Sequence, residues 1–141
     1  MIIHRRGLLA ASALAATGLA RPGLAQGQWP DRPIRLIVGF PAGGPTDFAA
    51  RLLQEPLQQL WGQPIVIENR AGATQNIAAE LVARAAPDGY TLFLSTSAHT
   101  TNPAVFTRLS WDPIRDFTPI VIIYSAPTVL FTGRNQSFRT V

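Results

Sequence analysis

The stretch GFPAGGPTD, residues 39–47, offers backbone amides rather than reactive side chains for chemistry. It follows an apolar run and precedes a helical pattern, and the first amides of a helix have no partner inside the helix. Together with the helix dipole, such amides attract a carboxylate or a phosphate. Gly43 and Gly44 have no side chain to shield their N–H groups, and Thr46 adds a hydroxyl. The stretch therefore predicts one part of an anion-binding site.

Two further loops are expected beside this one. Each follows an apolar run that predicts a strand, so all three belong at the carboxyl edge of one parallel sheet, where open α/β sheets bind ligands. A turn from a strand to a helix needs glycines and caps in any case, so each loop taken singly favours a structural turn. The residues that the two loops supply are Gly72, Thr74, Asn76, Ser95, Thr96 and Ser97.

Asp47 has two alternative roles in the first loop. It suits the first turn of a helix capped by Thr46, where a carboxylate is favourable. Beside a bound anion the Asp47 carboxylate would repel that anion, unless its oxygens accept hydrogen bonds from first-turn amides. If the ligand also carries an amine, Asp47 could bind that amine, and the sequence leaves both roles open.

Enzyme motifs are largely missing. The chain has no lysine, which excludes a Walker-type phosphate loop, and neither GxGxxG nor GxSxG occurs. His99 stands among Ser95, Ser97 and Thr100, which leaves a secreted α/β hydrolase as the rival hypothesis. A lone loop histidine meets none of the geometric tests of a catalytic group, so we expect no catalytic residue.

Metal and cofactor sites are not expected either. The chain has no cysteine, and Asp112 and Asp116 stand in the stretch WDPIRDF, which has a structural pattern. We therefore expect no metal and no cofactor.

The basic composition does not indicate a nucleic-acid partner. All 12 basic residues are arginines, against 8 acids, and the net charge is +4. Three arginines fall within the first 25 residues, so the rest of the chain is nearly balanced, and its arginines form no patch.

The first 25 residues have the pattern of a secretory signal peptide. A charged start, MIIHRRG, precedes the apolar run LLAASALAATGLA at residues 8–20, and the small residues Gly23 and Ala25 suit cleavage after Ala25. The apolar run is too short for a membrane span, which needs about 20 residues. We therefore expect the protein to be exported.

Strands and helices alternate in the mature chain. The pattern predicts an α/β fold with a parallel sheet. Pro56 should kink or split the first helix, and Gly62 should end it. The apolar faces are expected from Phe48, Leu52, Leu53, Leu57 and Leu60 in the first helix, and from Ile77, Leu81, Val82 and Ala85 in the second. The expected strands are residues 34–40, 64–69 and 90–95, the expected helices 46–61 and 77–86, and further apolar runs are 119–125 and 128–132.

Four stretches carry a resemblance to a known family. In chain order they are WPDRPIRLIVGFPAGGPTDFAARLL, GQPIVIENRAGATQNIAAELVARAAPDGYTLFLSTS, NPAVF and DPIRDFTPI. They resemble the Bug family, the periplasmic solute-binding receptors of tripartite tricarboxylate transporters, from about Trp29 to the end of the chain. The resemblance implies a type II periplasmic-binding-protein (Venus-flytrap) fold, in which two α/β lobes close on a small carboxylate and deliver it to membrane permease subunits. It also implies a non-enzymatic protein that is a monomer when full length.

The family's ligand loops transfer to this chain by position. Two departures occur: Gln75 stands where glycine is frequent, which affects ligand choice, and Gly39 stands where proline is common. Relatives are about twice as long by two-domain sizing. We therefore expect a signal peptide at 1–25, most of the first lobe at 26–126, and the start of the second lobe at 127–141, with a non-binding truncated receptor as a further alternative. The implied ligand residues are Phe40, Pro41, Ala42, Gly43, Gly44, Thr46, Asp47, Gly72, Ala73, Thr74, Asn76, Ser95, Thr96 and Ser97.

Overall fold

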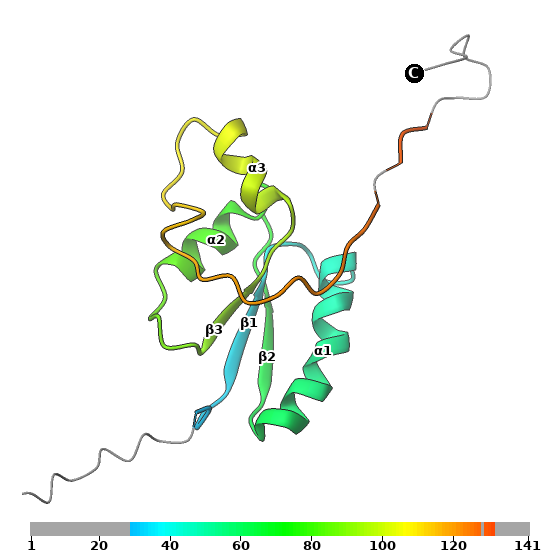
Figure 1. Cartoon of the computed structure of the whole chain (residues 1–141), viewed down its shortest axis with the longest axis vertical. Coiled ribbons are helices and arrows are strands. Elements are labelled where there is room, and N and C mark those ends of the chain that lie inside the picture. Colours follow the sequence, from blue (N-terminus) through cyan, green and yellow to red (C-terminus); the bar gives the residue numbers. More distant parts are fainter. Residues whose placement is uncertain (1–28, 128, 132–141) are drawn as a thin grey trace, which may run out of the picture. The chain divides into compact units, whose positions relative to one another are not determined.

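The computed structural model describes residues 29–127 and 129–131. The expected signal peptide and residues 132–141 of the expected second lobe lie outside the described residues. Strands and helices alternate as the sequence predicts (Figure 1). In chain order the elements are β1 (Ile34–Val38), α1 (Pro45–Trp61), β2 (Ile65–Asn69), α2 (Asn76–Ala83), β3 (Thr91–Leu94) and α3 (Ala98–Val105).

The three strands form one parallel sheet in the order β2-β1-β3. The chain therefore moves outward on one side of β1 and then crosses to the other side. Right-handed crossovers in opposite directions place α1 and α2 on opposite faces of the sheet. Accordingly α1 packs against β1 and β2, whereas α2 packs against β1 and β3 (Figure 1). This arrangement confirms the α/β fold and makes the carboxyl end of β1 the point where the strand order reverses.

The side chains of β1 alternate between two buried layers. Ile34, Leu36 and Val38 form a core cluster on the α1 side, together with Ala50 of α1. Ile37 points to the other face and is fully buried as well. On that side α2 contributes two fully buried small residues, Ala78 and Ala79, so its backbone can approach the sheet closely. A strand buried on both faces explains the continuous apolar run IRLIV.

The ends of α1 are set by glycines. Gly44 is the N-cap and Pro45 the first helical residue, so the prediction that Thr46 caps the helix is wrong. Thr46 lies inside the first turn and is buried. Gly62 ends the helix as predicted, in a left-handed conformation with φ 65°, and its N–H donates to the carbonyl of Gln58.

Pro56 lies inside α1 and does not split it, which corrects the expectation of two helical pieces. The proline removes the N–H that would bond to the carbonyl of Leu52. Both Pro56 and Leu52 are exposed, so water can satisfy that carbonyl and the helix continues.

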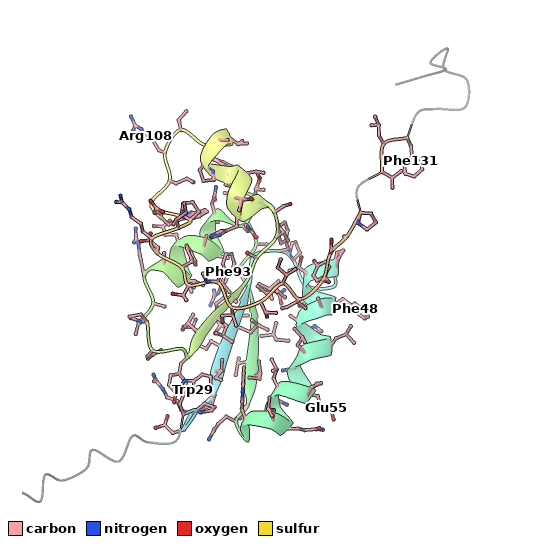
Figure 2. The ribbon with its side chains drawn as sticks, viewed as in Figure 1. Trp29, Phe48, Glu55, Phe93, Arg108 and Phe131 are labelled. Atoms are coloured by element: carbon pink, nitrogen blue, oxygen red, sulfur yellow. The ribbon has the colours of Figure 1, made fainter. Side chains whose placement is uncertain are left out.

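The apolar residues of α1 form two stripes rather than the one predicted. Leu57 and Trp61 pack against the core cluster, whereas Phe48 and Leu52 lie on the opposite side of the helix and are 63% and 61% exposed. Figure 2 shows Phe48 pointing away from the sheet. Leu60 of α1 and Ile77 of α2, also predicted to be buried, are exposed. Helical spacing indicates which residues share a face, but it does not say which face meets the sheet.

Residues beyond β3 differ most from expectation. The third predicted loop, with Ser95, Thr96 and Ser97, leads directly into the helix α3, which the sequence pattern did not predict. Residues 119–127 and 129–131, which include most of the two further apolar runs, have no regular secondary structure and are exposed. Across the described part of the chain, no helix is long and apolar enough to cross a membrane.

Candidate functional site

The three predicted loops meet at the carboxyl edge of the sheet, where side-chain amides link them. Asn69, at the end of β2, donates through Nδ2 to the carbonyl of Phe40 and to Oδ1 of Asp47, both at 3.0 Å. The Oε1 atom of Gln75 accepts the backbone N–H of Thr96 at 3.2 Å. The second loop is therefore joined to the third, and the end of β2 to the first.

Asp47 is the most heavily bonded side chain of the first loop. Its carboxylate is buried and accepts hydrogen bonds from Arg51 Nε and from the Gly43 backbone N–H, both at 2.8 Å, besides the one from Asn69. The Arg51 hydrogen bond, followed by those of Gly43 and Asn69, lowers the pKa of Asp47 to about 2. Both carboxylate oxygens have protein donors, so the geometry favours a loop-organising role over the recognition of an amine.

The two glycines expected to offer open amides are used within the loop. Gly43 has φ 83° and donates its N–H to Asp47, and Gly44 donates to the carbonyl of Pro41 at 3.4 Å. No side chain caps the N-terminus of α1 in the structure. The amides of Thr46 and Asp47, in the first helical turn, have no acceptor inside the helix and are the candidate anion donors of this loop.

The second loop has an unusual backbone. Ala73, Thr74 and Gln75 have φ values of 45°, 51° and 64°, a left-handed run that costs non-glycine residues about 1 kcal/mol or more each. Gln75 is the N-cap residue of α2, and no side chain caps this helix either. Asn102 of α3 donates through Nδ2 to the carbonyl of Thr74 and to Oδ1 of Asn76. Asn102 of α3 therefore holds the second loop in place. The start of α2 lies at the carboxyl edge of the sheet, as does the start of α1.

The third loop satisfies its own amides. Thr96 Oγ1 accepts the N–H of Ala98 at 3.3 Å, and the carbonyl of Ser97 accepts the N–H groups of Thr100 and Thr101. The first turn of α3 is therefore more closed than the first turns of α1 and α2. Of the three predicted loops, the first two keep helix-start amides available for an anion.

The arginines nearest to these loops are already paired. Arg51 bonds to Asp47, and Arg70, which begins the second loop, bonds to Glu68 Oε2 at 2.9 Å. Glu68 also accepts two hydrogen bonds from Arg35 of β1, at 2.6 and 3.1 Å. The hydrogen bond from Arg35, and then that from Arg70, lower the pKa of Glu68 to about 2. Anion binding here would rest on backbone amides rather than on a free cation.

His99 lies in an aromatic cluster and not in a catalytic triad. Its ring stacks on Trp111 at a centroid distance of 5.0 Å and meets Phe117 and Phe93 edge-on at 4.6 and 6.0 Å. Its Nε2 atom is 3.1 Å from the carbonyl oxygen of Pro113, and neither ring nitrogen bonds to a serine. This geometry contradicts the hydrolase hypothesis, because a general base must reach its nucleophile.

The stretch WDPIRDF is structural, as its pattern predicts. Asp112 Oδ1 accepts the N–H groups of Ile114 and Arg115, and Asp116 Oδ2 accepts the N–H of Asp112. The hydrogen bonds from the backbone N–H groups of Arg115 and Ile114 lower the pKa of Asp112. Among the residues that the structure describes, no group of three or more histidine, aspartate or glutamate side chains is placed to hold a metal.

Sequence reasoning missed the side-chain amides that hold the loops. Asn69, Gln75 and Asn102 each bond across more than 20 residues of sequence, and Gln75 and Asn102 are buried. Buried amides are expected to be hydrogen-bonded, but nothing in the sequence marks them as buried. The one available signal was Gln75, which stands out in a loop of small residues.

The comparisons with known proteins agree on one family. Residues 49–141 match the model of the tripartite tricarboxylate transporter family receptor. A UPF0065 protein from the tcbD-tcbE intergenic region of Pseudomonas sp. is 34% identical over 139 residues, which cover 99% of this chain and 41% of that protein. Protein BugT of Bordetella pertussis is 39% identical over 85% of this chain and 37% of its own length. The chain thus spans about two fifths of the length of these curated relatives.

Solved structures give the same result. MatC from Rhodopseudomonas palustris, with bound malate, matches with a TM-score of 0.57 and 43% identity over 64% of this chain and 31% of MatC. Rpa4515 from R. palustris, with adipate, matches with a TM-score of 0.58 and 44% identity over 60% of this chain and 29% of Rpa4515.

Proposed function

Since the chain belongs to the tripartite tricarboxylate transporter receptor family, we propose that it contributes the first lobe of an exported receptor for a small carboxylate. The ligand would be a di- or tricarboxylate, an amino acid or an aromatic acid. Membrane permease subunits would receive it, and the protein would work in the periplasm after cleavage behind Ala25. In this proposal residues 26–126 belong to the first lobe and the second begins at 127.

The observation that carries the proposal is the pair of helix starts at one sheet edge. α1 and α2 both begin without a side-chain cap, and both begin beside the carboxyl end of β1, where the strand order reverses. Helix dipoles and unpaired amides favour a carboxylate there without any free cation. The malate and adipate in the names of MatC and Rpa4515 support the same ligand class.

The proposed ligand contacts are assigned by loop. The first-loop residues Phe40, Pro41, Ala42 and Gly44 would shape the wall, and Thr46 would offer its amide and hydroxyl. In our proposal Gly43 and the side chain of Asp47 do not contact the ligand but hold the loop in place through their hydrogen bond. The second and third loops would contribute Gly72, Ala73, Thr74, Asn76, Ser95, Thr96 and Ser97.

A thermal-shift screen of the full-length protein against organic acids tests the proposal. A ligand at a hundred times its dissociation constant should stabilise the protein by about 2.7 kcal/mol. We expect a small carboxylate such as malate or adipate to raise the melting temperature, and neutral sugars to leave it unchanged. A shift with a neutral sugar and with no carboxylate would refute the anion cradle.

The 141-residue chain is the matched control in that screen. One lobe offers part of the contacts and none of the closure, so its affinity should be lower by about a hundred-fold or more. Equal affinity in both proteins would contradict the two-lobe site. Absence of binding in both would contradict the proposed receptor function, and absence of binding in the 141-residue chain alone is what the truncated, non-binding alternative expects of that chain.

A further inference from the structure

Gln75 occupies the point where the three loops meet. It is fully buried at the start of α2, and its Oε1 accepts the Thr96 N–H of the third loop. Gln75 also packs against the backbone of Gly39 in the first loop. A Cβ added to Gly39 would lie 2.3 Å from the Gln75 Cβ. A side chain at position 39 is therefore incompatible with Gln75 in this position, and the two residues fit each other.

The other end of the same carboxamide has no partner. Gln75 Nε2 is buried and has no hydrogen-bond acceptor in the structure. Because Oε1 faces the Thr96 N–H, the amide cannot rotate by 180° without placing two donors against each other, so Nε2 stays on the opposite side. An unsatisfied buried donor is costly and calls for an explanation such as a ligand that supplies the acceptor.

The backbone that carries Gln75 is strained in the same place. Ala73, Thr74 and Gln75 are consecutive left-handed residues, and Gly72 before them has φ 139°. Such strain persists only where surrounding contacts hold it, and it gathers at ligand-binding and switching segments. A turn of this kind can rearrange when a ligand offers new contacts, which would bring the covered Nε2 into reach.

We propose that Gln75 is a specificity-determining residue whose Nε2 donates a hydrogen bond to an oxygen of the bound carboxylate. This inference rests on the proposed function and adds a side-chain donor to the backbone amides of α1 and α2. A glycine at this position would offer neither the donor nor the tie to Thr96. The ligand must therefore place an oxygen acceptor at the start of α2, next to Gly39.

The first test is Gln75→Glu in the full-length protein. Glutamate keeps the shape and an oxygen for the Thr96 N–H, but it replaces the donor by an oxygen that repels a carboxylate. We expect malate or adipate, whichever binds the wild type, to bind at least about ten-fold more weakly. The matched control is Gln59→Glu on the exposed side of α1, which adds the same charge and should bind within about two-fold of the wild type.

The second test needs no folded variant. In the NMR spectrum of the wild type, the side-chain NH₂ signals of Gln75 should shift when the binding acid reaches saturation. Unmoved Gln75 signals at saturation, or Gln75→Glu binding within two-fold of the wild type, would overturn this inference and leave the proposed function intact. A wild type that binds no carboxylate at all would instead overturn the proposed function itself.

Discussion

At the scale of the residue, Asp47 shows how one carboxylate organises the first loop. It holds Gly43, four residues upstream, and Asn69, on the neighbouring strand, while Arg51 balances its charge. The N-terminal amides of α1 have no side-chain cap because the N-cap residue is Gly44, and Asp47 bonds backward to the N–H of Gly43. Asp47 therefore holds the first loop together, and in the proposed function it supports the anion site without competing for the ligand.

Asp47 also predicts an acid-sensitive loop. The hydrogen bonds lower its pKa from an ordinary 3.8 to about 2, so its contribution to stability is complete above pH 4 and is lost as the pH falls toward 2. Asp47→Asn should lower the melting temperature at pH 7 by about 5 °C or more and should flatten its decline between pH 4 and 2. Melting curves across this pH range measure both effects.

The control for this prediction is Glu55→Gln, an exposed carboxylate on the same helix. It should leave both the melting temperature and its pH profile close to those of the wild type. If Asp47→Asn melts like this control, the carboxylate does not organise the loop.

At the scale of the element, α1 contains Pro56 in its interior, although proline normally disrupts a helix at such a position. The missing hydrogen bond falls on the exposed side, where water replaces it, while Leu57 and Trp61 hold the other side to the core. Tertiary packing thus outweighs a local penalty.

Pro56→Ala should therefore stabilise the protein. Alanine restores the N–H and is the best helix former, although the unfolded chain gains freedom, so we expect a net gain of about 1–2 kcal/mol. Urea denaturation measures it, with the exposed Gln59→Ala as a control that should change stability by less than about 0.5 kcal/mol. A loss of stability in Pro56→Ala would show that the proline serves the helix.

At the scale of the whole molecule, the described chain ends in an uncovered apolar segment. Ile120, Val121 and Ile122 are 77%, 74% and 86% exposed, and Leu130 and Phe131 are 83% and 84% exposed. Exposure of this extent is unusual in a stable soluble protein. The curated relatives are more than twice as long as their match to this chain, so further chain is available in them to cover such a segment.

We expect the amides of residues 120–124 to be protected from hydrogen exchange in the full-length protein and to exchange freely in the 141-residue chain. Burial beside the second lobe would give them stable partners, whereas the short chain leaves them in water. The amides of β1 serve as the internal reference, since they should be protected in both proteins. Free exchange of 120–124 in the full-length protein would contradict this expectation.

The sequence alone determined the order of strands and helices from β1 to β3, the parallel sheet and the family resemblance. These follow from local patterns: apolar runs such as IRLIV, the glycine at position 62 and the motifs of the loops. Such patterns depend on neighbours in the chain, so one sequence suffices to read them.

Only the tertiary structure decided which groups of the loops are free. Gly43 donates its backbone N–H to Asp47, and Thr96 donates its backbone N–H to Gln75. His99 packs in an aromatic cluster. The stripes of α1 were likewise assigned only by its contact with the sheet, which left Phe48 outside. The physical reason is the same in each case. Hydrogen-bond partners and buried faces are chosen by residues distant in sequence, and local patterns contain no information about them.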